Sequence, residues 1–219
     1  IYALSLHDAL PISKLYPLVR TSWEGLACWN YSPCIYAYKA TDIAITGKGT
    51  IDAGGNNDTF WQWNGSPRFG YKEGVTKESQ KLGSRSKLLK MAEDGVPFDE
   101  RKFGMGYGLR PQLVNMVHCE RILIKDVKMI NSPFWVIHPL LSKNITVDGV
   151  YVWNEGPNGD GCDPEACENV LIQNCVFLVL EEGATLHFAF EPKLYPLVRT
   201  SWRSESTRLN SSHLVISYA

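Results

Sequence analysis

The sequence contains no long hydrophobic run and no marked excess of either charge. None of its apolar stretches approaches the ~20 residues that a membrane-spanning helix requires. The 22 Lys and Arg residues nearly balance the 23 Asp and Glu residues, which gives a net charge of −1. The first residues, IYALSLHDALPIS, show neither the basic nor the apolar region of a signal peptide. The sequence therefore predicts neither a membrane protein nor a nucleic-acid-binding protein.

Cysteine is too scarce for a disulfide-stabilised scaffold, since the 219 residues contain only six. Cys162 and Cys167 stand five residues apart, but no His follows at the spacing of a zinc site, so we expect no metal site. Hydrophobic residues make up 44% of the chain and charged residues 21%, as in ordinary globular proteins. A chain of this length and composition can form one medium-sized domain or two small ones.

The middle of the chain repeats one pattern of apolar residues three times. The segments are Cys119–Pro133, Ser142–Gly156 and Cys167–Phe177. In each, two apolar positions spaced by two are followed by a short step and two more apolar positions. An earlier segment, Ala40–Gly55, matches the first half and then slips by one residue. The equivalent positions, at spacings of 23 and then 25 residues, are Ile122/Ile145/Val170, Ile124/Val147/Ile172, Val127/Val150/Cys175 and Met129/Val152/Phe177.

A period of this length is typical of stacked units that cannot bury their apolar faces alone. Alternation with β-branched residues indicates that each unit consists of short strands. The sequence therefore predicts an all-β fold, a solenoid of parallel strands called a β-helix. In such a stack Cys119 and Cys167 would lie two strands apart, ~10 Å, which is too far for a disulfide.

Two other architectures compete with the β-helix. Leucine-rich repeats share the period, but their Leu-x-x-Leu-x-Leu pattern is absent. A sandwich of short antiparallel strands is the remaining alternative, and it would require hairpin turns between consecutive strands.

The repeat is interrupted between Gly65 and Gly108. This stretch is charged, and it contains four apolar residues partly at helical spacing: Leu82, Leu88, Leu89 and Met91. We expect a long excursion from the solenoid that carries one short helix, stopped by Pro97 because proline removes a backbone donor and clashes with the preceding turn. Such an excursion either walls a binding groove or is a plain surface loop.

Two stretches, Gly108–Val150 and Asn154–Cys175, together resemble the polygalacturonase family of glycoside hydrolases (family 28), the pectin-cutting β-helices. The asparagine–any–aspartate motif of that family stands here at Asn158-Gly159-Asp160. The stretches NSPFWVIHP (131–139), WEGLACWNYSPCIYAY (23–38) and ITGKGTIDAGG (45–55) also resemble this family, most closely its bacterial, often exo-acting branch. The likeness covers about residues 14 to 177. It implies a right-handed parallel β-helix of the pectin-lyase-like type.

The resemblance implies hydrolysis of α-1,4-galacturonosidic bonds in pectin with inversion. One carboxylic acid protonates the leaving oxygen, and carboxylates ~6.5–9.5 Å away activate a water on the opposite side. On this basis Asp160 is a catalytic carboxylate on the water-activating side, and Asn158 positions Asp160 or contacts the sugar. Without the resemblance, Asp160 would read as an ordinary Asp in a Gly-rich turn.

Further candidates for substrate binding each have a structural alternative. His138 would line the sugar groove or be a hydrogen-bonded, half-buried His. Arg110 would pair with a galacturonate carboxylate or form a structural ion pair. Trp61 and Trp63 would stack on sugar rings or pack in the core. The resemblance implies pectin or an oligogalacturonide as substrate, a monomeric protein that is secreted or periplasmic, and no cofactor.

The rest of the family's active site does not follow Phe177. The family next presents an Asp-Asp pair, then Gly-His-Gly and then Arg-x-Lys, and none of these motifs occurs after Phe177. One Asp of that pair is the general acid, so we expect the chain to be inactive or nearly so. Two other functions stay open. One is a pectate-lyase-like β-helix, which uses Ca²⁺ and a basic residue, and the other is a non-catalytic carbohydrate-binding β-helix.

The ten residues KLYPLVRTSW occur twice, at Lys14–Trp23 and at Lys193–Trp202. In the family, a strand similar to LEEGATLHF precedes LYPLVRTSW near the start of the domain. We therefore expect residues 14–177 to form the N-terminal part of the hydrolase domain and residues 178–202 to be its displaced leader. The displaced strand would pair onto the open end of the solenoid and act as a cap. Residues 1–13 and 203–219 resemble translated sequencing-adapter DNA.

Overall fold

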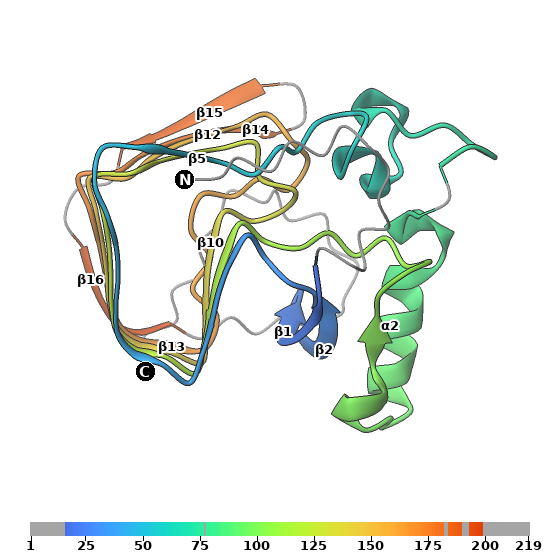
Figure 1. Cartoon of the computed structure of the whole chain (residues 1–219), viewed down its shortest axis with the longest axis horizontal. Helices are drawn as coiled ribbons and strands as arrows, with labels where there is room; N and C mark the ends of the chain where they lie inside the picture. Colours follow the sequence, from blue (N-terminus) through green and yellow to red (C-terminus); the bar gives the residue numbers. More distant parts are fainter. Residues whose placement is uncertain (1–15, 77, 182–183, 190–192, 199–219) are drawn as a thin grey trace.

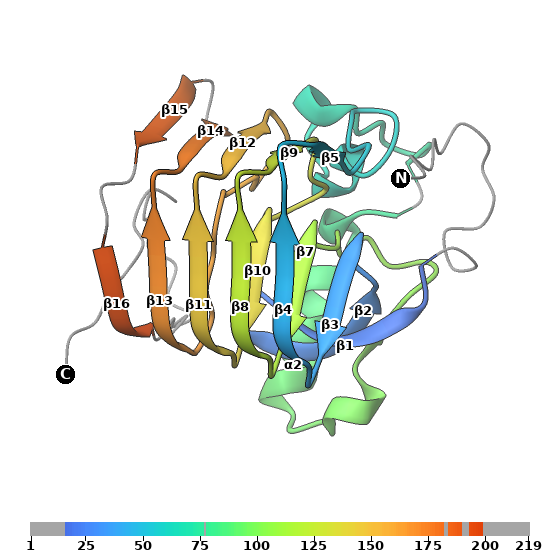
Figure 2. The same cartoon turned by 60° about the vertical axis from the view of Figure 1, so that its left-hand side comes forward.

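The computed structural model describes residues 16–76, 78–181, 184–189 and 193–198. The chain winds in successive turns, and each turn adds one strand to each of three sheets (Figures 1 and 2). This arrangement is a parallel β-helix, so the predicted all-β solenoid is confirmed. The segments that resemble adapter sequence, residues 1–13 and 203–219, lie outside the described residues.

Four turns can be followed through the three sheets. The first sheet has the order β10-β7-β3, and isolated bridges add Cys162 and Glu165 of the fourth turn beside β10. Its strands are β3 (Ile35–Tyr38), β7 (Val114–Val117) and β10 (Ile137–Leu140). The second sheet contains β4 (Thr41–Thr46), β8 (Glu120–Lys125), β11 (Lys143–Asp148), β13 (Cys167–Gln173) and β16 (Lys193–Val198). The third contains β5 (Thr50–Asp52), β9 (Lys128–Ile130), β12 (Tyr151–Asn154), β14 (Val176–Glu181) and β15 (Ala184–Ala189).

The predicted apolar columns stack one above another inside the solenoid. Ile122 pairs in register with Ile145, which pairs with Val170, and each is at most 2% exposed. These strands run parallel to their neighbours in the turns above and below, which excludes the antiparallel sandwich. The core therefore consists of one apolar side chain per turn at each interior position.

The first turn joins these columns with the predicted slip of one residue. Ile43 pairs with Ile122, and Ile51 pairs with Met129, so the separation along the chain falls from 79 to 78 residues. The first turn thus matches the later ones in both sheets although its corner is one residue longer.

The corners of the solenoid use left-handed backbone conformations. Lys39, His118, Leu141 and Ala166 occupy the same corner in the four turns, each with φ between 50° and 53°. Asp148-Gly149 forms another corner, with a φ of 66° at Gly149. This dipeptide is typical of hairpin turns, but here it leads from one parallel sheet into the next.

A hairpin precedes the solenoid and lies against its first sheet (Figure 1). Its strands β1 (Leu18–Trp23) and β2 (Leu26–Tyr31) pair antiparallel, and β6 (Lys102–Phe103) pairs with β2. The Trp23 ring is buried and stacks on Phe134, with ring centres 5.2 Å apart. An aromatic cluster outside the solenoid thus fixes the hairpin to it.

The predicted excursion from the solenoid leaves after β5 and returns at β7. Its helix, α2 (Ser84–Glu93), ends before the predicted stop at Pro97, because the chain turns at Gly95 with a φ of 69°. Within the described residues, the other helical elements are 3₁₀ turns: η1 (Trp61–Asn64), η2 (Pro67–Phe69), η3 (Gln80–Leu82) and η4 (Phe98–Glu100).

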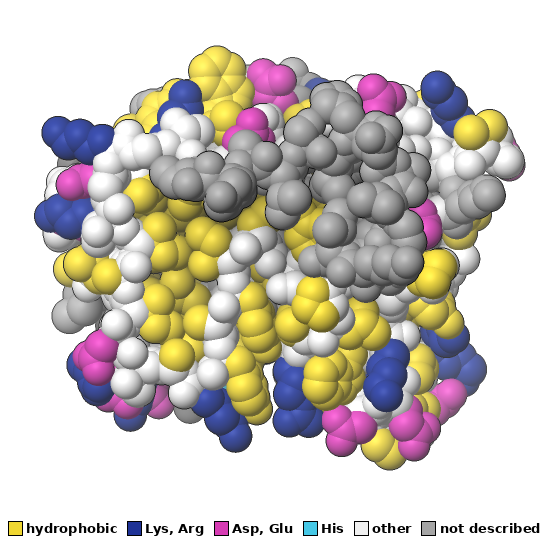
Figure 3. Space-filling view, viewed as in Figure 1, with side chains coloured by type: hydrophobic (Ala, Val, Ile, Leu, Met, Phe, Trp, Pro, Cys, Tyr) yellow, Lys and Arg dark blue, Asp and Glu magenta, His cyan; other side chains and the backbone are white. Residues whose placement is uncertain are grey.

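The last described strands close one end of the solenoid. β15 pairs antiparallel with β14, and β16 pairs antiparallel with β13. β15 and β16 therefore lie on the edge where residues 178–202 were expected to form a cap. Figure 3 shows hydrophobic side chains inside the ring of strands that Figure 1 presents end-on. On the first turn, Ile43, Ile45 and Ile51 are only partly buried.

All six cysteines are free thiols, and Cys119 and Cys167 are buried, as predicted. Ser142 stands between them in the same column, since the strands that follow these three residues are in register. In the ranges that the structure describes, no helix is long and apolar enough to cross a membrane. The same ranges contain no group of three or more His, Cys, Asp or Glu side chains placed to hold a metal ion.

Candidate active site

The Asn158-Gly159-Asp160 motif lies in the connection that leads from β12 into the fourth strand position of the first sheet. The Val136 amide donates to the carbonyl oxygen of Asp160 at 2.8 Å, and the Asp163 amide donates to the carbonyl of Ile137 at 2.8 Å. The backbone around Asp160 is therefore held by the turn beneath it, at the edge of the first sheet. The Asp160 side chain is half-buried and Asn158 is exposed.

Glycine flanks Asp160 because neighbouring side chains leave no room for a Cβ atom. A Cβ on Gly159 would lie 2.1 Å from Nδ2 of Asn154, and one on Gly161 would lie 2.4 Å from the ring of Phe177. The left-handed residue of the turn is Asn158, with a φ of 53°. The two glycines thus serve close packing, and the sharp bend that their sequence suggested falls on Asn158 instead.

Arg110 is fully buried directly behind Asn158. Its Nη2 donates to Oδ1 of Asn158 at 2.7 Å and to Oε1 of Gln80 at 3.1 Å, and its Nη1 donates to the carbonyl oxygens of Pro133 and Pro157. Burial lowers the pKa of Arg110 to about 9, against the charges of Glu24 and Asp160. Arg110 therefore fixes the motif from the protein side.

This placement differs from both roles that the sequence suggested for Arg110. At 0% exposure its guanidinium does not reach a sugar in solvent, and none of its four hydrogen bonds goes to a carboxylate. The sequence did not predict the burial of Arg110, because Arg is usually found at protein surfaces.

His138 is also fully buried. It directly follows Ile137, the residue of β10 that bridges to Cys162 of the fourth turn. Its Nε2 lies 3.1 Å from Oε2 of Glu165, and its Nδ1 lies 3.1 Å from Nδ2 of Asn115. The hairpin completes this network, since Ser22 donates to Glu165 and Thr21 donates to Asn115. His138 thus fits the alternative of a hydrogen-bonded His, more deeply buried than expected, and it does not line a groove.

Two carboxylates that the sequence did not single out for catalysis, Asp163 and Glu165, follow Asp160 in the segment that bridges to β10. Burial raises the pKa of Asp163 well above its usual range, and the charges of Asp160 and Glu165 act in the same direction. The Oδ2 atom of Asp163 is buried and has no hydrogen-bond partner among the described residues. Side chains of an extended chain point alternately to its two faces, so residues 163 and 165 lie on the same face. This alternation is the signal in the sequence that could have found them.

The excursion lies beside the motif. This position fits the first of the two roles expected for it, the wall of a binding groove. Gln80 of η3 contacts Arg110, and Nδ2 of Asn64 lies 3.5 Å from Oδ1 of Asn158. Arg85 of α2 donates from Nε to Oε2 of Glu24 at 2.8 Å, which ties the helix to the hairpin tip. The excursion therefore lies beside Asn158, and α2 ties it to the hairpin.

The two tryptophans of η1 are buried and do not face solvent. Trp61 is 9% exposed and donates from Nε1 to the carbonyl of Ser132 at 2.9 Å. Trp63 is 4% exposed and packs edge-on against Phe60, with ring centres 5.2 Å apart. Trp61 and Trp63 are thus placed for packing and not for stacking on a sugar ring.

Comparison with known proteins identifies this arrangement. Residues 104–180 match the family model of glycosyl hydrolases family 28. The solved structure of a hyperthermoactive exopolygalacturonase from Thermotoga maritima superposes with a TM-score of 0.74 at 42% sequence identity. This chain is therefore related to glycosyl hydrolases family 28. The predicted family and the right-handed parallel β-helix of the pectin-lyase-like type are thus confirmed.

The chain covers only part of the length of these relatives. The superposition spans 78% of this chain and 38% of the Thermotoga protein. A probable polygalacturonase from Vitis vinifera is 28% identical over 168 residues, which are 75% of this chain and 26% of the Vitis protein. The chain therefore spans between about a quarter and two fifths of these two relatives.

Proposed function

We propose that this chain carries the water-activating half of the active site of an inverting polygalacturonase, with Asp160 as the carboxylate that activates the water. The supporting observation is the position of Asn158-Gly159-Asp160 in a family 28 solenoid. The motif opens the fourth strand position of the first sheet, half-exposed, with the Asp160 carbonyl bonded to the Val136 amide and the following Gly161 carbonyl bonded to the Ile137 amide. In an inverting glycosidase the second carboxyl group stands ~6.5–9.5 Å away, which leaves room for the water.

In this proposal Arg110 and His138 position other groups and do not contact the sugar. Arg110 orients Asn158 through the 2.7 Å bond to its Oδ1, so that the exposed Asn158 side chain faces the substrate in one orientation. His138 holds Glu165 and Asn115, to which the hairpin is bonded. Both residues would therefore affect activity through the geometry of the residues around Asp160.

The substrate in this proposal is pectin or an oligogalacturonide, taken from the names of the Vitis and Thermotoga relatives. The protein would act outside the cytoplasm, where such polymers occur. Asp-Asp, Gly-His-Gly and Arg-x-Lys do not occur after Phe177 in the sequence, so the general acid is not among these residues. The chain by itself would then turn over little or no substrate, because each acid–base group typically contributes ~10²–10⁴-fold to the rate.

The hairpin supports attack at the end of the polymer chain. β1 crosses the outward side of the first sheet, bonded to Asn115 of the second turn and to Glu165 of the fourth turn. Its tip is tied to α2 through Glu24 and Arg85. A polymer that runs past Asp160 would therefore meet a wall on this side, which favours release of terminal sugars, as in the Thermotoga exopolygalacturonase.

We also propose that residues 178–202 are the displaced leader of this domain and that 1–13 and 203–219 come from adapter sequence. The second copy of KLYPLV in β16 and the antiparallel pairing of β15 support the displacement. The nucleotide sequence of the source gene tests it. An uninterrupted gene that encodes the order seen here would overturn the proposal.

The catalytic proposal is tested with the purified chain and its Asp160→Asn variant on polygalacturonate. We expect the release of reducing ends to stay at background for both proteins, while oligogalacturonide binding weakens in Asp160→Asn. Asp126→Asn, at a corner on the other side of the solenoid, is the matched control and should bind as the unmodified chain does. Turnover abolished by Asp160→Asn would show that this chain contains its own acid. Products that absorb in the ultraviolet would instead indicate a lyase.

A further inference from the structure

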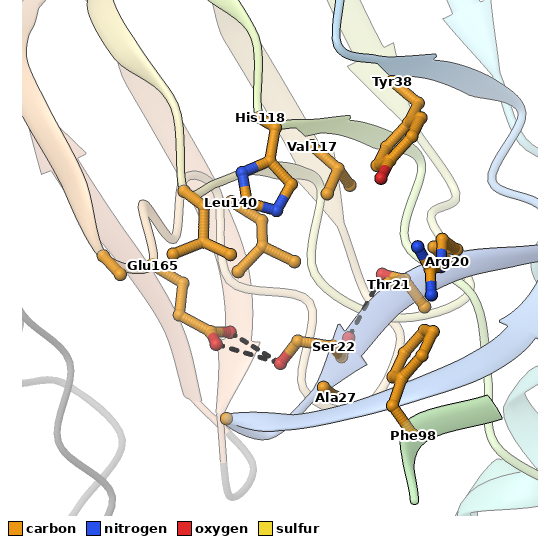
Figure 4. A pocket seen from close by; sticks show the side chains of 13 residues that line it. Arg20, Thr21, Ser22, Ala27, Tyr38, Phe98, Val117, His118, Leu140 and Glu165 are labelled. Carbon is orange, nitrogen blue, oxygen red and sulfur yellow. Dashed lines mark hydrogen bonds between the residues drawn. The ribbon is translucent and has the colours of Figure 1, made fainter. Parts of the chain in front are cut away.

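A cavity of about 510 Å³ opens between the hairpin and the outward side of the first sheet (Figure 4). Its floor is a column of register neighbours at the ends of the strands: Tyr38, Val117, Leu140 and Glu165. Glu165 follows Asp160 by five residues, which is ~16 Å along an extended strand. The cavity is therefore separate from the Asn158-Gly159-Asp160 motif, and none of the residues proposed for catalysis lines it.

One wall of the cavity presents fixed hydrogen-bonding groups. Ser22 of β1 donates to both carboxylate oxygens of Glu165, at 2.9 and 3.0 Å, and Nε2 of His138 holds the same carboxylate from behind. The Glu165 side chain is 11% exposed. Because an ionised carboxylate accepts about four hydrogen bonds, Glu165 has capacity left for a hydroxyl group that enters the cavity.

The mouth of the cavity carries a cation held against aromatic rings. The guanidinium carbon of Arg20 lies 4.4 Å from the ring centre of Phe98, and its Nη2 contacts Asp99 at 3.1 Å. The Tyr38 hydroxyl faces this guanidinium, which raises the pKa of Arg20 and lowers the pKa of Tyr38. The Nε atom of Arg20 is buried and has no hydrogen-bond partner among the described residues. The exposed His118 stands at the opposite rim in Figure 4.

We propose that this cavity binds a small hydroxylated carboxylic acid the size of one sugar ring. Its carboxylate would pair with Arg20, its hydroxyls would bond to Glu165 and Ser22, and its apolar face would rest on Phe98. A cavity of this size, with apolar walls and a few convergent polar groups, is typical of small-molecule sites, and guanidinium groups favour carboxylates. Because Asp99 already neutralises part of the Arg20 charge, we expect weak binding, on the order of 1 mM. This inference does not depend on the proposed function, since Asp160 takes no part in it.

Galacturonate is the probe, and galactose is its neutral counterpart, both titrated into the full chain and followed by NMR. Ala27→Trp would fill the cavity from an exposed position of β2, and Ala44→Trp, at an exposed position of β4 outside the cavity, is the matched control. We expect saturable galacturonate binding that weakens at least about tenfold, or ~1.4 kcal/mol, in Ala27→Trp and stays unchanged in Ala44→Trp.

Arg20→Gln tests the part of the proposal that concerns the acid group. The Arg20–Asp99 ion pair is exposed, and such pairs contribute little to stability, so we expect this variant to fold. Its affinity for galacturonate should fall to that for galactose. The proposal is overturned by three results: no saturable binding of galacturonate, binding that Asp160→Asn abolishes and Ala27→Trp leaves intact, or equal binding of both sugars that Arg20→Gln does not change.

Discussion

Gly161, next to the proposed catalytic Asp160, is the position where the packing of the site can be perturbed most cleanly. A Cβ atom at residue 161 would lie 2.4 Å from Cγ and 2.5 Å from Cδ2 of Phe177. Carbon atoms pack at ~3.5–4.0 Å, so the ring would have to move by about 1 Å. Phe177 is 3% exposed inside the last parallel turn, and crowding of this kind in a packed core costs ~1–3 kcal/mol. We expect Gly161→Ala to destabilise the protein by that amount.

The assay is urea unfolding followed by tryptophan fluorescence. Gly49→Ala is the matched control, because a Cβ at residue 49 meets no atom within 4 Å and the backbone there does not need glycine. That variant should be neutral or ~0.4–1 kcal/mol more stable. The double variant Gly161→Ala/Phe177→Leu should be less destabilised than the sum of its single changes, since the smaller side chain removes the clash, with a coupling of ~0.5–3 kcal/mol. A Gly161→Ala protein that unfolds at the same urea concentration as the unmodified chain would refute the reasoning.

Three further substitutions probe the groups around the motif. Arg110→Met removes four hydrogen bonds from a fully buried side chain, and in urea unfolding it should cost ~3–5 kcal/mol because the carbonyl oxygens of Pro133 and Pro157 stay buried without a donor. Asn115→Ala leaves Thr21 and His138 without their shared partner, so it should cost ~1–3 kcal/mol and speed proteolysis of the hairpin; unchanged cleavage would contradict this. Asp163→Asn tests a pH dependence. The folded pKa of Asp163 is raised above 3.8, so its stabilisation is complete below that pH. It is lost as the pH rises through the folded pKa, by up to ~1.4 kcal/mol per pH unit. Asp163→Asn should flatten that part of the profile, and an identical profile would count against it.

The stacking of the solenoid could be predicted because it depends on one simple property of the sequence. Ile122, Ile145 and Val170 are apolar at the same place in each repeat, and a strand that buries one face in a stack allows no other register. The one-residue slip at Ala40–Gly55 was also visible, since an inserted residue shifts the second half of the pattern and leaves the first half intact.

The surroundings of the site could not be predicted, because they depend on contacts between distant segments. Nothing in the sequence near His138 shows that Ser22 and Thr21 of the hairpin cover it, 116 and 117 residues earlier. Arg110 gives a similar case, since a charged residue in a loop usually lies at the surface, and only the loops that carry Pro133 and Pro157 bury it. The family resemblance singled out Asp160, but it did not show which neighbours surround it.

The most direct test of the account places residues 104–180 of this chain into the Thermotoga maritima exopolygalacturonase, in exchange for its own equivalent segment. That segment would supply the proposed water-activating Asp160, and the rest of the Thermotoga protein would supply what this chain lacks. We expect the chimera to hydrolyse polygalacturonate, and we expect Asp160→Asn in the chimera to lower kcat by ~10²–10⁴-fold. A chimera that hydrolyses its substrate at the same rate with and without Asp160→Asn would contradict the central claim.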